Sequence, residues 1–270
     1  MSAEVARLFV TRGDARLEVL AQGRGRPIVL LPSLGRGAGD FDAIAARLAA
    51  DNRVLRPQPR GIGGSTGSWQ DVDLHALAAD IAAVIEQDGG APAFVVGHAF
   101  GNRVARMLAT DRPELVAAVA LVAANVGHAP SPPDVRAAIR ISADVSMPDY
   151  KRLEALRFLF FAPGNDAQVW LQGWHPDVLA AQRIAGDLTP RTADYAAGLA
   201  PILYVQPSHD PLARADEAAE YRRAVGDRVT VVVIPNSSHA VIVEQPGAVA
   251  AALIAYADQL WPARVYTRQS

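Results

Sequence analysis

The sequence predicts an α/β fold: a mostly parallel, twisted sheet with helices on both faces and one helical insertion. Two observations lead to this class. Continuous apolar runs, which are typical of strands buried on both faces, alternate with segments of helical periodicity. The alternation stops near residue 127, gives way to proline-punctuated, aromatic-rich sequence, and resumes after residue 190. The length of 270 residues fits one such domain with an insertion, or at most two small domains.

The first half of the chain opens with a predicted hairpin. Two segments with alternating polarity, at 8–11 and 15–20, are separated by the turn Arg12-Gly13-Asp14. Asp40 is expected to be the N-cap of the first helix. Strands then follow at 27–31, 53–55, 93–96 and 116–123, and helices at 41–50, 73–87 and 102–110.

The second half begins with the insertion and then returns to the strand and helix pattern. Strands are expected at 201–205 and 229–234, and helices at 213–224 and 248–260. Segments 1–126 and 191–270 are therefore predicted to form the core, and 127–190 a helical cap or lid. The residues after Pro262 are expected to be a loose tail.

The composition of the chain excludes several classes of function and of chemical site. The net charge of -2 provides no basic field for nucleic acid, so no such partner is expected. The absence of cysteine excludes disulfides, thiolate metal sites and a cysteine nucleophile. The first residues lack the pattern of a signal peptide, and the longest apolar run, 116–124, is too short to span a bilayer. We expect a cytoplasmic protein, monomeric or homodimeric, that does not associate with membranes.

One segment carries the strongest indication of chemistry. The predicted strand at 93–96 runs directly into Gly97-His98-Ala99-Phe100-Gly101, and a helix follows at once. This is the context of a nucleophile elbow, Gly-x-Ser-x-Gly. The turn is so tight that both glycines must lack side chains, and the central residue is held in a strained conformation over the sheet edge.

Two further polar segments follow later strands in a matching order. Ser208-His209-Asp210-Pro211 comes after the strand at 201–205, and Ser237-Ser238-His239 comes after the strand at 229–234. Nucleophile, acid and histidine in this order, each just beyond a strand, resemble the α/β-hydrolase superfamily. The resemblance covers nearly the whole chain and implies that Asp210 orients His239, the general base. Ala99 departs from it, because the superfamily has Ser, Asp or Cys there.

The resemblance also implies an oxyanion hole. Its expected donors are the backbone N–H groups of Leu34 and Phe100. The superfamily usually has His-Gly where this chain has Pro32-Ser33, which is a second departure. The segment 56–65 resembles the superfamily's Asp-x-Arg-Gly-x-Gly-x-Ser stretch.

Aromatic side chains of the insertion are expected to supply part of an apolar pocket wall, since a lid usually does so. The candidates are Trp170, Trp174 and Phe161. His98 is expected to pack under the elbow, and His175 to be a weaker candidate for substrate contact. Asn125 occupies the alternative acid position of some relatives, but an amide cannot supply the charge. The remaining histidines are expected to be solvated or structural: His75, His128 and His209.

Other site types are not supported. The glycine-rich stretch 35–39 lacks the spacing of a dinucleotide-binding loop, and no acidic ribose partner ends the next strand. The sequence has neither a Walker loop nor metal-ligand spacing. No cofactor or metal is therefore expected.

Alanine at position 99 leaves two interpretations. The chain is either a serine hydrolase whose nucleophile has been replaced by engineering, or a native binding protein that is non-catalytic or uses His239 for other chemistry. The retained acid, base and elbow glycines favour the first. Aspartate, as in dehalogenases and epoxide hydrolases, is a rival parent residue, although those relatives usually carry Trp where this chain has Phe100.

The expected substrate is a small to medium, largely apolar carboxylic ester or lactone. Pro32-Ser33-Leu34-Gly35 resembles the Asn-Ser-Leu-Gly of enol-lactonases, which gives a weak indication of lactones. The sequence does not identify the acyl or alcohol group.

Overall fold

The computed structural model describes residues 4–89, 92–127 and 132–261. An eight-stranded sheet in the order β1-β2-β4-β3-β5-β6-β7-β8 forms its centre. The expected hairpin is present, and β2 pairs antiparallel with both β1 and β4, whereas the strands from β4 to β8 are parallel. The strands are β1 Ala6–Arg12, β2 Ala15–Gln22, β3 Arg26–Leu31, β4 Asn52–Pro57, β5 Ala93–His98, β6 Val116–Val122, β7 Ile202–Pro207 and β8 Val229–Ile234.

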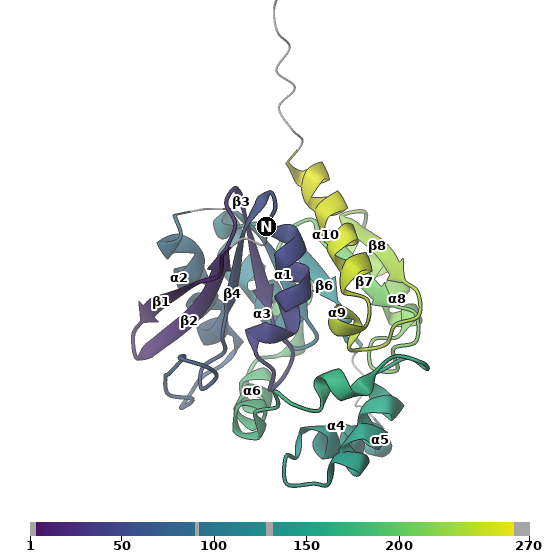
Figure 1. Cartoon of the computed structure of the whole chain (residues 1–270). Helices are drawn as coiled ribbons and strands as arrows, with labels where there is room; N and C mark the ends of the chain where they lie inside the picture. The colour runs from purple at the N-terminus through teal and green to yellow at the C-terminus, as the bar shows by residue number, and fades with distance from the viewer. Residues whose placement is uncertain (1–3, 90–91, 128–131, 262–270) are drawn as a thin grey trace, which may run out of the picture.

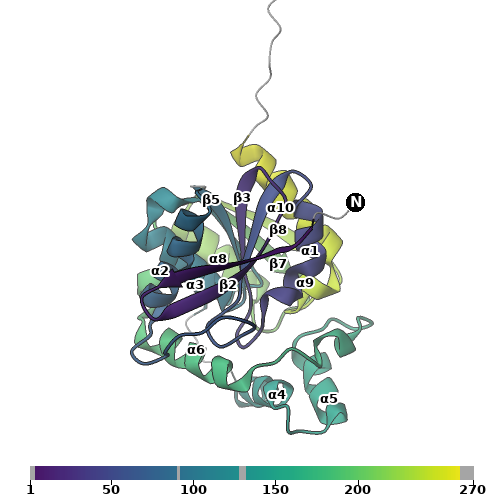
Figure 2. The ribbon, with the colours of Figure 1, turned by 60° about the vertical axis from the view of Figure 1, so that its left-hand side comes forward.

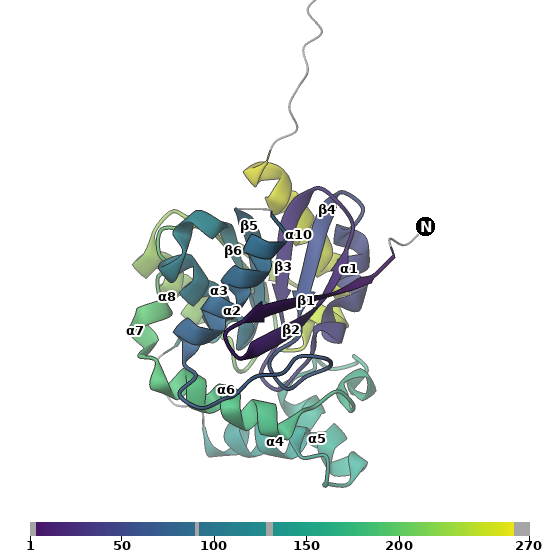
Figure 3. The same cartoon turned by 90° about the vertical axis from the view of Figure 1, so that its left-hand side faces the viewer.

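Helices cover both faces of this sheet, as the sequence predicts (Figures 1 and 3). The apolar cluster on one face takes side chains from α1 Asp42–Leu48 and α10 Pro246–Leu260. The cluster on the other face takes them from α2 Leu74–Gln87, α3 Gly101–Asp111 and α8 Ala215–Val225. The central strands are buried from both sides, which explains why β5 is apolar at nearly every position.

The chain between β6 and β7 is helical where it is described and lies beyond one end of the sheet (Figures 1 and 2). It has an apolar cluster of its own, centred on Leu156, Phe160 and Trp170. Leu212 and Ala240, which follow β7 and β8, belong to the same cluster, so the insertion packs on the core through apolar contact. Its helices are α4 Pro133–Ala143, α5 Asp149–Leu159, α6 Pro176–Leu188 and α7 Arg191–Asp194.

Helix starts follow local sequence, with one correction. Asp73 caps α2 by accepting a hydrogen bond from the Ala76 N–H at 2.8 Å, and Pro133, Pro176 and Pro246 occupy first helical positions. The predicted N-cap role of Asp40 is wrong. Asp40 lies inside a short 3₁₀ turn, Ala38–Phe41, where its carboxylate is paired with Arg36.

Two predictions concern residues that the structure does not describe. The tail after Pro262 and His128 both lie outside the described residues. Among the described helices, none is long and apolar enough to cross a bilayer. The insertion packs on the end of the sheet where the parallel strands finish, and Ala99, Asp210 and His239 lie at that end.

Candidate active site

The turn between β5 and α3 has the geometry of a nucleophile elbow. Ala99 has φ +49°, a left-handed conformation that is strained for a residue with a side chain. Its N–H donates to the Val122 carbonyl at 3.0 Å, which holds the turn against the end of β6. The Asn102 side chain adds two hydrogen bonds to the backbone of Val122, so α3 and β6 are fixed together.

The two elbow glycines are required by close backbone contact. A methyl group added at Gly97 would overlap the backbone of Gly101, and one added at Gly101 would overlap the carbonyl of Leu31. Strand, turn and helix therefore approach each other more closely than any other residue type allows. The central side chain consequently stands at the carboxyl end of the sheet, and in this chain it is a methyl group.

Asp210 and His239 meet beside this turn. His239 Nδ1 lies 2.8 Å from Asp210 Oδ2, and the side chain of Asp210 is fully buried. Asp210 Oδ1 accepts a hydrogen bond from the Leu212 N–H at 2.8 Å, which fixes the carboxylate in its turn. Because Asp210 accepts a hydrogen bond from Nδ1, the imidazole carries its proton on Nδ1. Nε2 is therefore unprotonated and can accept a proton. The pair thus has the geometry of an oriented general base.

His98 supports this base from below. Its Nε2–H donates to the backbone carbonyl of His239 at 2.7 Å. Burial lowers the pKa of His98 to about 3, with the nearby His239 adding to the effect. A neutral His98 thus holds the backbone of the His239 loop at ordinary pH, in keeping with its expected place under the elbow.

The two expected oxyanion donors lie at the same cavity as Ala99. Leu34 and Phe100 both line it, and within the described residues neither backbone N–H donates a hydrogen bond to another group. Phe100 precedes α3, where the first N–H groups of a helix have no partner inside the helix. Both donors are therefore available to a ligand.

The cavity has a volume of about 260 Å³ and lies between the strand ends and the lid. Core residues that line it follow β3, β5, β6, β7 and β8, which is the usual place for a site in such a sheet. Its apolar wall comes equally from the insertion and from the core. The lining residues are Ser33, Leu34, Ala99, Phe100, Arg103, Asn125, Ile139, Phe160, Trp174, Leu179, Arg183, Arg191, Leu212 and His239.

Of the three aromatic candidates in the lid, the structure brings one to the cavity. Trp174 lines it. Trp170 is fully buried in the lid's own core, with the Arg36 guanidinium 4.7 Å from its ring centre, and Phe161 faces a different surface hollow. The prediction is therefore wrong for Trp170 and Phe161 as lining residues, because packing inside the insertion decides which way each ring points.

The remaining polar candidates lie as follows. Asn125 lines the cavity, and its buried Oδ1 accepts no hydrogen bond from the described residues. His175 is not a lining residue; its N–H donates to the Gly35 carbonyl at 2.9 Å. His75 pairs with Asp111 at the surface, and the exposed His209 contacts Ser208.

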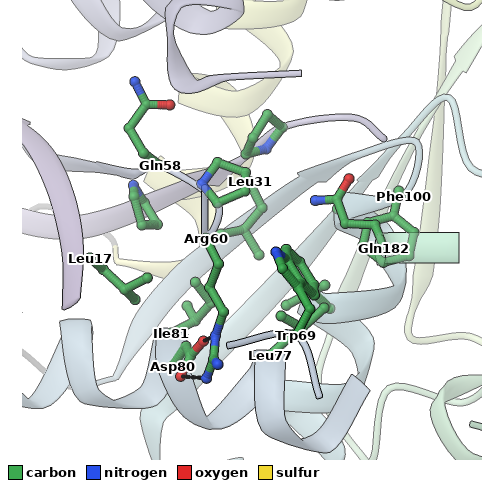
Figure 4. Close-up of a pocket in the computed structure, with 15 residues that line it drawn as sticks. Leu17, Leu31, Gln58, Arg60, Trp69, Leu77, Asp80, Ile81, Phe100 and Gln182 are labelled. Carbon is green, nitrogen blue, oxygen red and sulfur yellow. Dashed lines mark hydrogen bonds and ion pairs between the residues drawn. The ribbon is translucent and has the colours of Figure 1, made fainter. Parts of the chain in front are cut away.

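A second, smaller hollow shares Phe100 with this cavity (Figure 4). Its volume is about 50 Å³, and its walls are mainly apolar, with Trp69 and Gln182 among them. The buried Arg60–Asp80 ion pair, 2.7 Å between Nε and Oδ2, closes one end. Neither His239 nor Ala99 lines this hollow, so it is separate from the chemical site.

Sequence reasoning missed the residues that hold the histidine loop against the lid. Glu244 accepts hydrogen bonds from the N–H groups of Ser238 and Ala162, both at 2.7 Å. The Ala240 N–H donates to the Phe160 carbonyl at 2.8 Å. Glu244 is partly recognisable from sequence, since it follows His239 by five residues. Phe160 is not, because its role uses only its backbone oxygen.

Comparison with known proteins agrees with this geometry. The model of a family described as the alpha/beta hydrolase family matches residues 28–252. Epoxide hydrolase A of Mycobacterium tuberculosis is 35% identical over 133 residues, which are 46% of this chain and 40% of that protein. RutD of Azorhizobium caulinodans, provisionally named a carbamate hydrolase, is 34% identical over 110 residues, 41% of this chain and 42% of that one. The matches thus span less than half of these relatives.

A solved structure extends the likeness to nearly the full chain. A thermophilic esterase from Thermogutta terrifontis superposes with a TM-score of 0.79, covering 94% of this chain and 99% of that one. The two sequences are 21% identical, so the comparison shows a shared fold.

The elbow contact leads to a stability prediction. We expect Gly97→Ala to lower the free energy of unfolding by about 3 kcal/mol or more, because its methyl group would overlap backbone that cannot move aside. Gly247→Ala is the matched control. Gly247 lies in α10 with open space at its Cβ, so alanine there should be neutral or stabilising. Chemical denaturation measures both; equal losses would contradict the contact.

The buried His98 leads to a prediction about pH. Its pKa is about 3 in the folded chain and 6.5 in the unfolded one, so the unfolded chain binds the extra proton between these values. Stability should therefore fall as pH drops below about 6.5, by at most about 1.4 kcal/mol for each pH unit from this group. In denaturant titrations from pH 7 to 4, His98→Gln should flatten this dependence. The surface variant His75→Gln should not; equal slopes in all three proteins would contradict the assignment.

Proposed function

Since the chain belongs to the alpha/beta hydrolase family, we propose that its cavity is a hydrolase site for a small to medium, largely apolar carboxylic ester or lactone. The observation that carries the proposal is the buried Asp210–His239 hydrogen bond beside the elbow. An oriented imidazole, two available N–H groups and an apolar wall are the parts that acyl transfer requires. The hydrolase and esterase names of the relatives support the same reaction class.

The proposed chemistry needs a hydroxyl at position 99. With serine there, His239 Nε2 would take the hydroxyl proton as the oxygen attacks the carbonyl carbon. The N–H groups of Leu34 and Phe100 would bind the oxyanion, and the imidazolium would return the proton to the leaving alcohol. Water would then release the acyl group by the same steps, with His239 again as base.

Alanine at position 99 removes the first of these steps and leaves the rest. A methyl group cannot attack a carbonyl, so we propose that the chain binds its substrate without forming an acyl-enzyme. An engineered serine-to-alanine replacement accounts for the retention of Asp210, His239, Gly97 and Gly101 together. A native alanine would make the protein a binding protein, or one whose His239 activates water directly.

Epoxide hydrolysis is the second candidate, and the name of the M. tuberculosis relative favours it. That chemistry would use aspartate at position 99, whose carboxylate opens the epoxide ring before water hydrolyses the ester formed. Phe100 favours serine as the parent residue, because relatives with aspartate as the nucleophile usually carry Trp at this position. The two candidates share Asp210 and His239 and differ in the residue at position 99. Ring opening would also need a proton for the epoxide oxygen, which water would have to supply because the described lining holds no tyrosine or carboxylic acid.

The direct prediction is that Ala99→Ser creates an esterase. Against a panel of short and medium acyl esters and lactones, we expect kcat/KM to rise at least about 10³-fold over the unchanged chain. Ala99→Asp is tested in parallel against epoxides. Spectrophotometric and pH-stat assays measure both, and the substrates that turn over identify the class.

The control removes the base. His239→Gln in the Ala99→Ser background should reduce the gained activity about 10²-fold or more, because general-base catalysis is lost. If Ala99→Ser stays inert on every ester and lactone while the protein remains folded, the proposal fails. Turnover of the panel by the unchanged chain would instead assign the reaction to water activated by His239.

A further inference from the structure

Three arginines line the cavity that holds His239, and among the described residues no carboxylate side chain lines it. They are Arg103, Arg183 and Arg191, and they come from α3, α6 and the start of α7. The other lining side chains are apolar or uncharged, apart from the titratable His239. A neutral ester does not need three cationic side chains around its binding cavity.

Arg103 is held rigidly at the cavity wall. Its Nη1 donates to the Gly186 carbonyl at 2.7 Å, and its Nη2 donates to Thr189 and to Asp194. Arg103 is also the third residue of α3 and follows Ala99 by four residues. A guanidinium is therefore fixed in the wall of the cavity that Ala99 also lines.

The protein neutralises the positive charge here only in part. The buried Asp194 is shared, because Arg106 also contacts it, at 2.9 Å between Nη2 and Oδ2. Arg191 donates to the carbonyl of Gly127 at 2.8 Å and has no ion pair among the described residues. The pKa of Arg191 is lowered, first by burial and next by the nearby charges of Arg103 and Arg106. The charges of Asp194 and Asp187 offset this decrease only in part.

The third arginine, Arg183, and the amide of Asn125 line the same cavity. Arg183 is exposed on α6 and makes neither an ion pair nor a hydrogen bond with the described part of the chain. Asn125 keeps an unpartnered buried Oδ1 at the same cavity; this oxygen is an acceptor, so it does not contribute to binding a carboxylate. The unpaired Arg183 guanidinium and the Arg191 guanidinium, whose hydrogen bond goes to a neutral carbonyl, are donor groups suited to a carboxylate.

We infer that the substrate carries a carboxylate besides its scissile ester, as a half-ester of a dicarboxylic acid does. Resting on the proposed function, the inference names the substrate class: the ester lies over Ala99, and the carboxylate lies against Arg183 and Arg191. Guanidinium groups bind carboxylates through two parallel hydrogen bonds, which fixes orientation as well as charge. The apolar wall, including Trp174 and Phe160, contacts the carbon chain between them.

Binding to the unchanged chain tests the inference without any turnover. Monomethyl esters of succinic, glutaric and adipic acids are compared with their neutral dimethyl esters by isothermal titration calorimetry. We expect one monoester to bind at least about tenfold more tightly than its diester, because charge-assisted hydrogen bonds are stronger than neutral ones. Its affinity should fall at high salt, whereas that of the diester should not.

Variants locate the effect. Arg183→Gln combined with Arg191→Gln should weaken monoester binding about tenfold and leave diester binding unchanged. Arg157→Gln is the matched control, since this exposed lid arginine faces a different hollow. Equal affinities for monoester and diester, or tighter binding of an alkyl phosphate of the same length, would overturn the carboxylate assignment. Because Ala99→Ser can still hydrolyse neutral esters in that case, the two proposals fail separately.

Discussion

The backbone contact between Gly97 and Gly101 is the constraint on which the rest of the site depends. It forces β5 to turn directly into α3 and holds Ala99 at φ +49°, a strained conformation that tertiary contacts must maintain. The hydrogen bonds of Ala99 and Asn102 to Val122 provide those contacts. A chain that retains this arrangement presents position 99 to the cavity whatever residue stands there. This is why the absence of one hydroxyl group at position 99 separates the chain from the proposed chemistry.

His239, the proposed base, is held from three sides. Below it, the neutral His98 donates to the carbonyl of His239, and beside it Asp210 fixes the ring. Above it, Glu244 binds the N–H of Ser238 in the histidine loop and the N–H of Ala162 in the lid. Burial raises the pKa of Glu244, although its hydrogen bonds oppose that shift. The lid therefore forms the cavity wall and also holds the loop that carries the base, so lid packing and base orientation are coupled.

The parts of this account that sequence predicts are those set by local chemistry. Two glycines around a central residue, a strand before and a helix after allow only an elbow, and the order of Asp210 and His239 after later strands follows from the parallel sheet. Side-chain direction inside the insertion is different, since it depends on packing between helices that share no simple period. Trp170 packs in the core of the insertion against Arg36, and Phe161 lines another hollow. Arg183 and Arg191 line the cavity, although the sequence did not predict this. Asp40 failed as a cap because an ion pair with Arg36 was available.

The most direct test of the central claim is covalent labelling at position 99. Ala99→Ser is treated with an alkyl fluorophosphonate, digested and analysed by mass spectrometry, beside the unchanged chain and the Ala99→Ser, His239→Gln double variant. If the elbow presents an activated oxygen to the cavity, the single variant should gain one adduct on the peptide that contains position 99. The unchanged chain should gain none, and the double variant should react far more slowly. An unlabelled but folded Ala99→Ser protein, or equal labelling with and without His239, would contradict the account.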